Sequence, residues 1–324
     1  MSCVLNAEFI NRKIVRPTDK LPSNIVYATF TNMDRCAIND GIFREFVKST
    51  HSKDLLAPLP SHTIIVKASD LKLRVEKTQR YRNMPALQEN LLYTGCCDAH
   101  VQATSGISAG GGSKSSLRVD PMLKLYVGRP VMINKNIDVE KSIANGAMCT
   151  FKSVVLKNGY EDCDVLNIDG YYVRCVSADK VQFIEVVLQE GDTRKILKLE
   201  AESTSALASF PCPGPFDSEI TSSTPRRKKK IQLTQFPFNI ANARTVHKLQ
   251  GRSIENLLVS TWSYTTNWVY VVLSRVRTSN GLFVRVPLLH TKTSSPATIT
   301  DAERNQEFHS FCRREKNPKF LDYV

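Results

Sequence analysis

The heptapeptide TVHKLQG near the C-terminus brings several hydrogen-bond donors together within a short stretch. The four donors are a hydroxyl, an imidazole, an ammonium and an amide, on Thr245, His247, Lys248 and Gln250. The stretch 240–250 predicts a helix that closes on Gly251, so these donors should crowd its last turn and a half. Donors gathered in this way can hold a sugar-phosphate backbone without reading its sequence. Taken singly, the same residues also fit a solvated last turn, where the helix dipole favours Lys and His.

A second stretch, GISAGGGSKSS at 106–116, has nearly the composition of a nucleotide-binding P-loop. Counted back from Lys114, however, Ser113 and Ser108 stand where the two required glycines would be. The sequence that follows, LRVDPMLKLYVG, leads toward a strand and offers no helix to cap a phosphate. We therefore interpret this stretch as a flexible connector.

Basic residues dominate both the composition and one local run. The chain has 44 Lys and Arg against 31 Asp and Glu, a net charge of +13, which favours nucleic acid over an anionic membrane as partner. The run PRRKKK can contact backbone phosphates or serve as a nuclear localisation string, and a solvated loop stays an equal alternative. Its five basic residues are Arg226, Arg227, Lys228, Lys229 and Lys230.

Cysteine usage indicates a reducing compartment. The nine cysteines are odd in number and irregularly spaced, which predicts a nuclear or cytoplasmic protein, leaves a mitochondrial location open, and argues against secretion. No run of eighteen apolar residues occurs, so we expect no membrane span. Cys96, Cys97 and His100 lie close together in CCDAH, but we expect ordinary semi-buried thiols there and no metal.

The elements that would position these residues follow an α/β pattern at both ends of the chain. The apolar run 25–30 predicts a strand, and Asp34 can cap the helix that follows. Arg35 is expected to be a solvated residue of that helix. After residue 235 the pattern returns, with strands predicted in ENLLVST and GLFVRV and a helix in TNWVYVVLSRV.

Between these ends, short strands alternate with turn dipeptides. Asn145-Gly146, Asn158-Gly159 and Asp169-Gly170 favour hairpins that need positive φ. We read a small antiparallel barrel from residue 123 to about 200, then a Ser-, Pro- and Thr-rich mobile loop at 203–225. The predicted fold class is therefore α/β, a parallel sheet with helices interrupted by a β-barrel. The predicted domains are 1–122 with its connector, 123–235 with the loop, and 236–324 with a C-terminal tail.

TVHKLQG and YVVLSRVR together resemble the fifth and sixth signature motifs of Pif-type superfamily-one DNA helicases, a group related to RecD-like and Helitron helicases. ATFTNMDRCAIN, at about 28–39, resembles the fourth motif, VGRPVMINKNID with ANGA the start of the family's inserted barrel, and TQFPFNIANA the return to the motor lobe. The resemblance covers most of residues 24–286 and implies the C-terminal half of such an enzyme, with a second RecA-like lobe and functions in DNA repair and recombination.

The resemblance also implies roles for particular residues. Arg275 matches the sixth motif's arginine finger, which stabilises charge on the ATP γ-phosphate from the second lobe. The fifth motif implies binding of single-stranded DNA by Thr245, His247, Lys248, Gln250 and Gly251. Thr31, Asn32 and Asn39 match polar positions of the fourth motif, and turn or cap chemistry is an equal alternative for them. Val272 stands where the family commonly has Ala.

The P-loop, the Asp-Glu pair and the strand-sensing Gln of a first lobe find no counterpart in the 324 residues, and we expect no ATPase activity from the chain alone. Two hypotheses follow. The first is half of an ATP-dependent 5′-to-3′ DNA helicase that uses ATP and magnesium only with a complementing first-lobe polypeptide. The second is a non-catalytic nucleic-acid-binding or adaptor remnant of a helicase or transposon.

Overall fold

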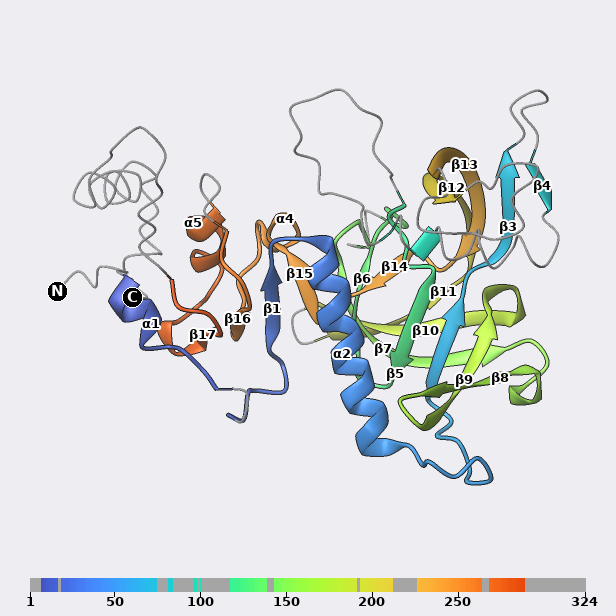
Figure 1. The fold of residues 1–324 in the computed structure, drawn as a ribbon, viewed down its shortest axis with the longest axis horizontal. Helices are drawn as coiled ribbons and strands as arrows, with labels where there is room; N and C mark the ends of the chain where they lie inside the picture. Colours follow the sequence, from blue (N-terminus) through green and yellow to red (C-terminus); the bar gives the residue numbers. More distant parts are fainter. Residues whose placement is uncertain are drawn as a thin grey trace. The chain divides into compact units, whose positions relative to one another are not determined.

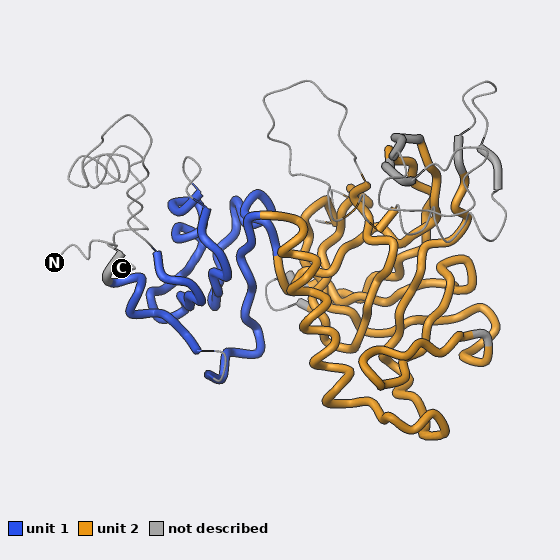
Figure 2. The backbone as a smooth tube through the Cα atoms, viewed as in Figure 1, with its two compact units in different colours: residues 1–30, 244–324 blue, residues 31–243 orange. Residues whose placement is uncertain are grey.

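The structure, a computed structural model, describes residues 7–16, 19–74, 81–83, 96–97, 100, 117–138, 143–190, 193–211, 226–263 and 268–288 (Figure 1). The chain divides into two compact units: residues 1–30 with 244–324, called unit 1, and residues 31–243, called unit 2 (Figure 2). The fold is mixed α/β, with few helices and with parallel as well as antiparallel strand pairs. The connector at 106–116 lies outside the described residues.

Unit 1 is built on a four-stranded sheet with the order β15-β1-β16-β17. Its strands are β1 (Val26–Thr29), β15 (Ala243–Thr245, which begins one residue before the unit boundary), β16 (Leu257–Val259) and β17 (Leu282–Val284). Strand β16 pairs in parallel with both β1 and β17. The helices of the unit are α1 (Ala7–Asn11), α4 (Val246–Leu249), α5 (Trp268–Leu273) and the 3-10 turn η3 (Ser279–Gly281).

The core of unit 1 explains the parallel pairing. All three residues of β16 are buried, as expected for a strand covered on both faces. Ala28, Leu257 and Val284 pack with apolar residues of the helices, among them Leu249, Val272 and Leu273. The strands predicted in 25–30, ENLLVST and GLFVRV and the helix in TNWVYVVLSRV are confirmed, each shorter than its sequence pattern.

Unit 2 begins with its one long described helix, α2 (Asn32–Thr50). The predicted helix is confirmed, but the prediction that Asp34 caps it is wrong. Thr31 is the N-cap, and its Oγ accepts the backbone N–H of Asp34 at 3.0 Å. Phe43 and Val47 are buried and pack against the strand residues Ile65, Val173 and Cys175, so α2 lies against a sheet face (Figure 1).

Three sheets complete the described part of unit 2, with strand orders β11-β10-β7-β6-β14, β12-β13-β3-β4 and β5-β2-β9-β8. The first holds β6 (Pro130–Ile133), β7 (Met148–Leu156), β10 (Val181–Glu190), β11 (Thr193–Leu199) and β14 (Phe238–Ile240). The second holds β3 (Ser69–Arg74), β4 (Tyr81–Asn83), β12 (Glu202–Pro211) and β13 (Arg226–Gln235). The third holds β2 (Thr63–Lys67), β5 (Met122–Tyr126), β8 (Asp164–Ile168) and β9 (Tyr171–Ser177), and the turns η1 (Tyr160–Asp162) and η2 (Ala178–Lys180) lie between strands.

All three glycines of the predicted turn dipeptides have positive φ, but the hairpin predicted at Asn158-Gly159 is wrong, because Gly159 leads into η1 and the flanking strands β7 and β8 lie in different sheets. Gly146 and Gly159 have φ of 97° and 84°, and Asp169 and Gly170 have 52° and 90° at the hairpin between β8 and β9. Strands β2 and β3, which precede residue 123, pair with the later strands β5, β9 and β13, so the sheets of unit 2 draw on more of the chain than the predicted barrel. The predicted domain boundaries at 123 and 235 stay a prediction.

Two local predictions are wrong. Residues 240–250 do not form one helix: Phe238, Asn239 and Ile240 pair with β6, residues 243–245 form β15, and only Val246–Leu249 is helical. The backbone of the segment therefore satisfies its hydrogen bonds in strand pairs with distant partners, which no local propensity encodes. Residues 203–211, read as part of a mobile loop, form β12 and pair with β13, while 212–225 lie outside the described residues.

Candidate nucleic-acid interface

The donors of TVHKLQG lie around a single helical turn. Val246 and Leu249 face the core of unit 1, whereas His247, Lys248 and Gln250 are exposed. Thr245, predicted among the binding residues, is the N-cap of α4 and is 4% exposed, so its hydroxyl lies inside the unit. Because α4 has only four residues, its dipole is small and favours Lys and His at the C-terminus only weakly.

Gly251 turns the chain away from α4. Its φ of 74° lies in the left-handed region, which favours glycine, and Arg252 N–H donates to the carbonyl of Leu249 at 3.2 Å. A Cβ at this position would meet no atom within 4 Å. The glycine is therefore required by its backbone conformation and not by a close neighbour.

Two arginines beside this turn were missed by the sequence reasoning. Arg244 is buried at 8% exposure just before Thr245, and burial, with the charge of Arg252 nearby, lowers its pKa to about 10. Two like charges this close to the exposed donors make the surroundings of α4 electropositive, which suits a phosphate. The signal was present as two arginines that flank the heptapeptide at 244 and 252.

Arg275 lies in the turn after α5 and is half-buried. Its Nε donates to the Val271 carbonyl at 3.2 Å, and its Nη2 donates to Ser274 Oγ at 2.8 Å. The guanidinium is thus folded against the end of its own helix. Arg277, by contrast, is exposed.

A parallel bridge joins Ile254, which lies shortly after TVHKLQG, to Val276 of YVVLSRVR. Ile254 N–H donates to the Arg275 carbonyl at 2.7 Å, and Arg277 N–H donates to the Ile254 carbonyl at 2.9 Å. The backbone on both sides of Arg275 is therefore fixed to the segment that leaves α4. In this way unit 1 joins the exposed donors and the predicted finger in one packed body.

The fourth-motif residues belong to unit 2, and two of them perform structural work there. The Thr31 hydroxyl donates to Asp34 Oδ2 at 2.7 Å while capping α2, which is the cap chemistry given as the alternative. Asn39 is buried, with its amide bound to the backbone at Ile240 and Ala243. Asn32 is half-buried at the start of α2. DNA binding by Thr31 and Asn32 stays a prediction.

The basic run is part of a strand and does not precede one. Residues 226–230 form the first half of β13 and pair with residues 207–211 of β12. The Lys230 side chain is exposed. Contact of this strand with backbone phosphates stays a prediction.

Both ring nitrogens of His100 contact protein groups. Its Nδ1 lies 3.2 Å from the carbonyl of Leu117, and its Nε2 lies 2.9 Å from Arg35 Nη2. Burial raises the pKa of the Cys96 thiol to about 12, which disfavours the thiolate that metals bind. Within the described ranges, no three His, Cys, Asp or Glu side chains gather as metal ligands. None of the described helices is both long and apolar enough to cross a membrane.

Comparison with known proteins gives matches only among solved structures. No family model matches the chain, and no curated protein matches it. Pif1 helicase from Candida albicans is similar at 18% identity and a TM-score of 0.49, covering 94% of this chain and 53% of that one. Bacteroides Pif1 bound to single-stranded DNA is similar at 17% identity and a TM-score of 0.47, covering 94% of this chain and 50% of that one. Both of these solved structures are Pif1 helicases, the family that the motifs resemble, and the chain spans about half their length.

Proposed function

We propose that the chain is the C-terminal half of an ATP-dependent 5′-to-3′ DNA helicase of the Pif type. In this proposal, His247, Lys248 and Gln250 hold the backbone of single-stranded DNA, and Arg275 is offered to ATP bound on a first lobe. The observation that carries the proposal is the bridge between Ile254 and Val276. It makes the DNA-contacting turn and the arginine one mechanical body, as a motor that couples strand movement to ATP turnover requires.

Unit 1 is proposed to be the core of a RecA-like lobe, and the antiparallel strands of unit 2 its inserted barrel. The parallel β1-β16-β17 set, with α5 connecting two of its strands, supports the first part. The hairpin at Gly170 between β8 and β9 and the long antiparallel pairing of β10 with β7 support the second.

ATP and magnesium are proposed to bind only when a first lobe completes the site. Arg275 would leave Ser274 and Val271 and approach the γ-phosphate, because a phosphate is a stronger acceptor than a hydroxyl or a carbonyl. Magnesium would be held by residues of the first lobe, since the described residues contain no cluster of three ligands.

ATP hydrolysis by the full chain, mixed with a purified first lobe of a Pif1 helicase and single-stranded DNA, tests this function. Arg275→Ala is expected to lower the rate of hydrolysis by about 10³-fold, the lower end of what an arginine finger contributes. Arg277→Ala is the matched control, because Arg277 is exposed two residues away, and it should keep the rate within a factor of about three. Hydrolysis by the isolated chain, or equal rates for the two variants, contradicts the proposal.

The Arg275 hydrogen bonds favour one second candidate, a non-catalytic nucleic-acid-binding module. There the guanidinium would only close the end of α5, as it does through Val271 and Ser274. Arg275→Ala would then lower the thermal stability of unit 1 while leaving every DNA-dependent activity unchanged.

A further inference from the structure

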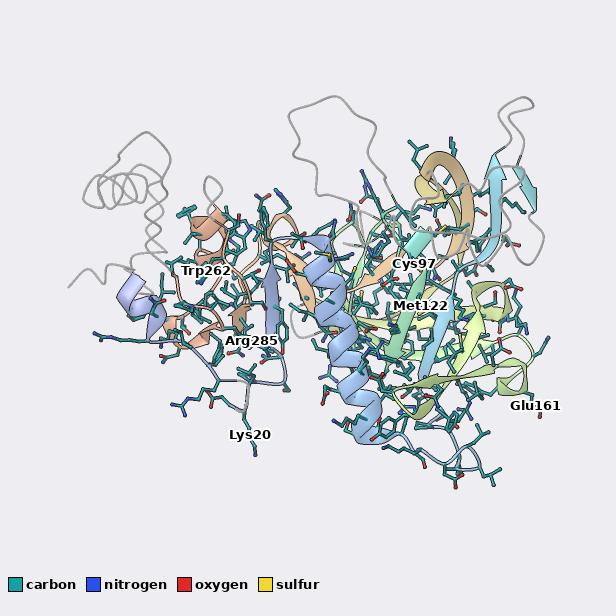
Figure 3. The ribbon with its side chains drawn as sticks, viewed as in Figure 1. Lys20, Cys97, Met122, Glu161, Trp262 and Arg285 are labelled. Carbon is teal, nitrogen blue, oxygen red and sulfur yellow. The ribbon has the colours of Figure 1, made fainter. Side chains whose placement is uncertain are left out.

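A pocket of about 450 Å³ opens in unit 2 between the first half of α2 and the residues around β5. Its lining comes from Met33, Arg35 and Asp40 on α2, and from Met122 and Lys124 on β5, with Cys97, His100 and Asp120 also contributing. Two of these residues, Cys97 and Met122, are labelled in Figure 3. The volume lies within the range of sites that hold small molecules.

Arg35, expected to be an ordinary solvated residue, has a buried guanidinium atom without a hydrogen-bond partner in the part of the chain that the structure describes. Its Nη2 lies 2.9 Å from His100 Nε2 and 3.4 Å from Cys36 Sγ. Its Nε is buried and makes no hydrogen bond to any described residue. Burial and the charge of Arg35 lower the pKa of His100, so the imidazole is neutral and its Nε2 accepts a hydrogen bond from the guanidinium. Among the described residues, the guanidinium of Arg35 therefore contacts only neutral groups and retains one unused donor.

Arg129, another lining residue, is fully buried, and its hydrogen-bond acceptors among the described residues are likewise neutral. It donates to the backbone carbonyls of Asn39 and Lys124 and to Asn242 Oδ1. Lys124, in contrast, is paired with Asp40. Among the described lining residues, three cations (Arg35, Lys124, Arg129) face two carboxylates (Asp40, Asp120), which leaves one positive charge. Because an uncompensated buried charge is costly, the pocket favours a ligand with a negative group.

The rest of the lining is apolar and rich in sulfur. Met33, Met122 and Ile240 line the pocket together with the thiols of Cys36 and Cys97. Thioether and thiol sulfurs are polarisable and make favourable contacts with aromatic rings. A bare inorganic anion would leave this part of the pocket unfilled.

We propose that the pocket binds a nucleotide, with the phosphate against Arg35 and the base among the methionine and cysteine sulfurs. The nucleotide is either free or the end of a nucleic-acid strand. The inference does not rest on the proposed helicase function, because every lining residue belongs to unit 2, whereas Arg275 and the α4 donors belong to unit 1.

Alkylation of Cys36 in the full chain, followed by peptide mass spectrometry, is the direct test. AMP at saturation should slow the reaction of Cys36 with N-ethylmaleimide at least threefold, because Cys36 lines the pocket. Cys163, also half-buried but outside the lining, should keep its rate. A 5′-phosphorylated oligothymidylate and its unphosphorylated form distinguish the sources: protection by the phosphorylated strand at lower concentration than by AMP assigns a strand end, and the reverse assigns a free nucleotide. If neither AMP nor the phosphorylated strand protects Cys36, the proposal is overturned.

Titration calorimetry with AMP and with inorganic phosphate separates the two parts of the pocket. Arg35→Ala should raise the Kd for AMP at least tenfold, while Lys48→Ala, an exposed charge near the end of the same helix, should leave it unchanged. Inorganic phosphate should bind at least tenfold more weakly than AMP. Equal Kd values for AMP in the two variants, or phosphate as tight as AMP, overturn the proposal. The Cys36 experiment uses the unsubstituted chain, so it decides the question even where Arg35→Ala fails to fold.

Discussion

The backbone N–H of Ala243 donates a 2.8 Å hydrogen bond to Oδ1 of Asn39, a residue 204 positions earlier in the chain. The amide nitrogen of the same side chain donates to the Ile240 carbonyl at 3.4 Å. One buried asparagine on α2 thus holds the backbone just before Arg244 and the heptapeptide. Asn39, which matches a polar position of the fourth motif, therefore positions the backbone that leads into TVHKLQG.

Asn39→Ala is expected to destabilise unit 2 by about 1–3 kcal/mol, because it leaves a buried N–H and a buried carbonyl without a partner. Thermal unfolding monitored by circular dichroism measures the change. Asn24→Ala is the control: its side chain also makes two hydrogen bonds, to Glu255 and Asn256, but both are exposed. That variant should change stability by less than about 0.5 kcal/mol. Equal effects of the two substitutions would show that the Asn39 contacts contribute nothing beyond surface bonds.

Gly281→Ala is expected to cost about 3 kcal/mol, because a Cβ at this position would lie 1.7 Å from the carbonyl oxygen of Glu255. Since that oxygen belongs to the backbone before β16, relief requires a shift of the sheet. Gly41→Ala is the opposite case, because Gly41 lies inside α2 and its Cβ would meet nothing within 4 Å. We expect that substitution to stabilise unit 2 by about 0.5–1 kcal/mol. Urea unfolding of both variants measures the two signs, and a stable Gly281→Ala variant would be the contradicting result.

Acidification is expected to destabilise unit 2 through His100. Its pKa is lowered below the ordinary 6.5, chiefly by burial and further by Arg35, while Asp120 acts in the opposite direction. Well above pH 6.5 the His100 imidazole is neutral in both the folded and the unfolded chain, and its contribution to stability is fully present. As the pH falls from there toward the lower folded-state pKa, only the unfolded chain takes up the proton, so stability is lost. His51, whose pKa burial also lowers, contributes in the same direction.

Melting temperatures between pH 8 and pH 5 measure this dependence. His100→Gln should flatten the curve, since glutamine still offers an oxygen acceptor to Arg35 and does not titrate in this range. The double variant with His51→Gln should flatten it further. A His100→Gln curve parallel to that of the unsubstituted chain would exclude His100 as the source.

What the sequence predicted well was local. The helix after residue 31 was predicted, although with Asp34 and not Thr31 as its cap, and Asp169-Gly170 forms the predicted hairpin, because both signals act over a few residues. The stretch 240–250 failed for the opposite reason. Its helical pattern competed with strand pairing to β6, more than 100 residues away, and the pairing prevailed.

For the candidate site, too, local features were predicted from the sequence, whereas features that depend on distant residues were not. Short strings predicted which residues carry donors and which arginine matches a finger, but not that Thr245 is buried or that Arg275 folds against Ser274. The pocket of unit 2 was out of reach, because Arg35, His100 and Arg129 come from three separate segments. Arg35 in isolation looks like any solvated helix residue, and only the packing of His100 and Asp120 beside it gives it a different environment.

Lys248→Ala is expected to weaken binding of single-stranded DNA and to change its salt dependence. Lys248 is exposed on α4, and neutralising one phosphate of a single strand contributes about 0.7 to the slope of log K against log salt. The slope of the variant should therefore be smaller in magnitude by about 0.7. The fluorescence anisotropy of a labelled oligothymidylate, titrated at NaCl concentrations from about 50 to about 300 mM, measures this slope. Lys20→Ala removes an exposed lysine of the same unit far from the heptapeptide in sequence, and it should keep the slope of the unsubstituted chain (Figure 3). If both variants keep that slope, Lys248 makes no phosphate contact and the strand is held elsewhere.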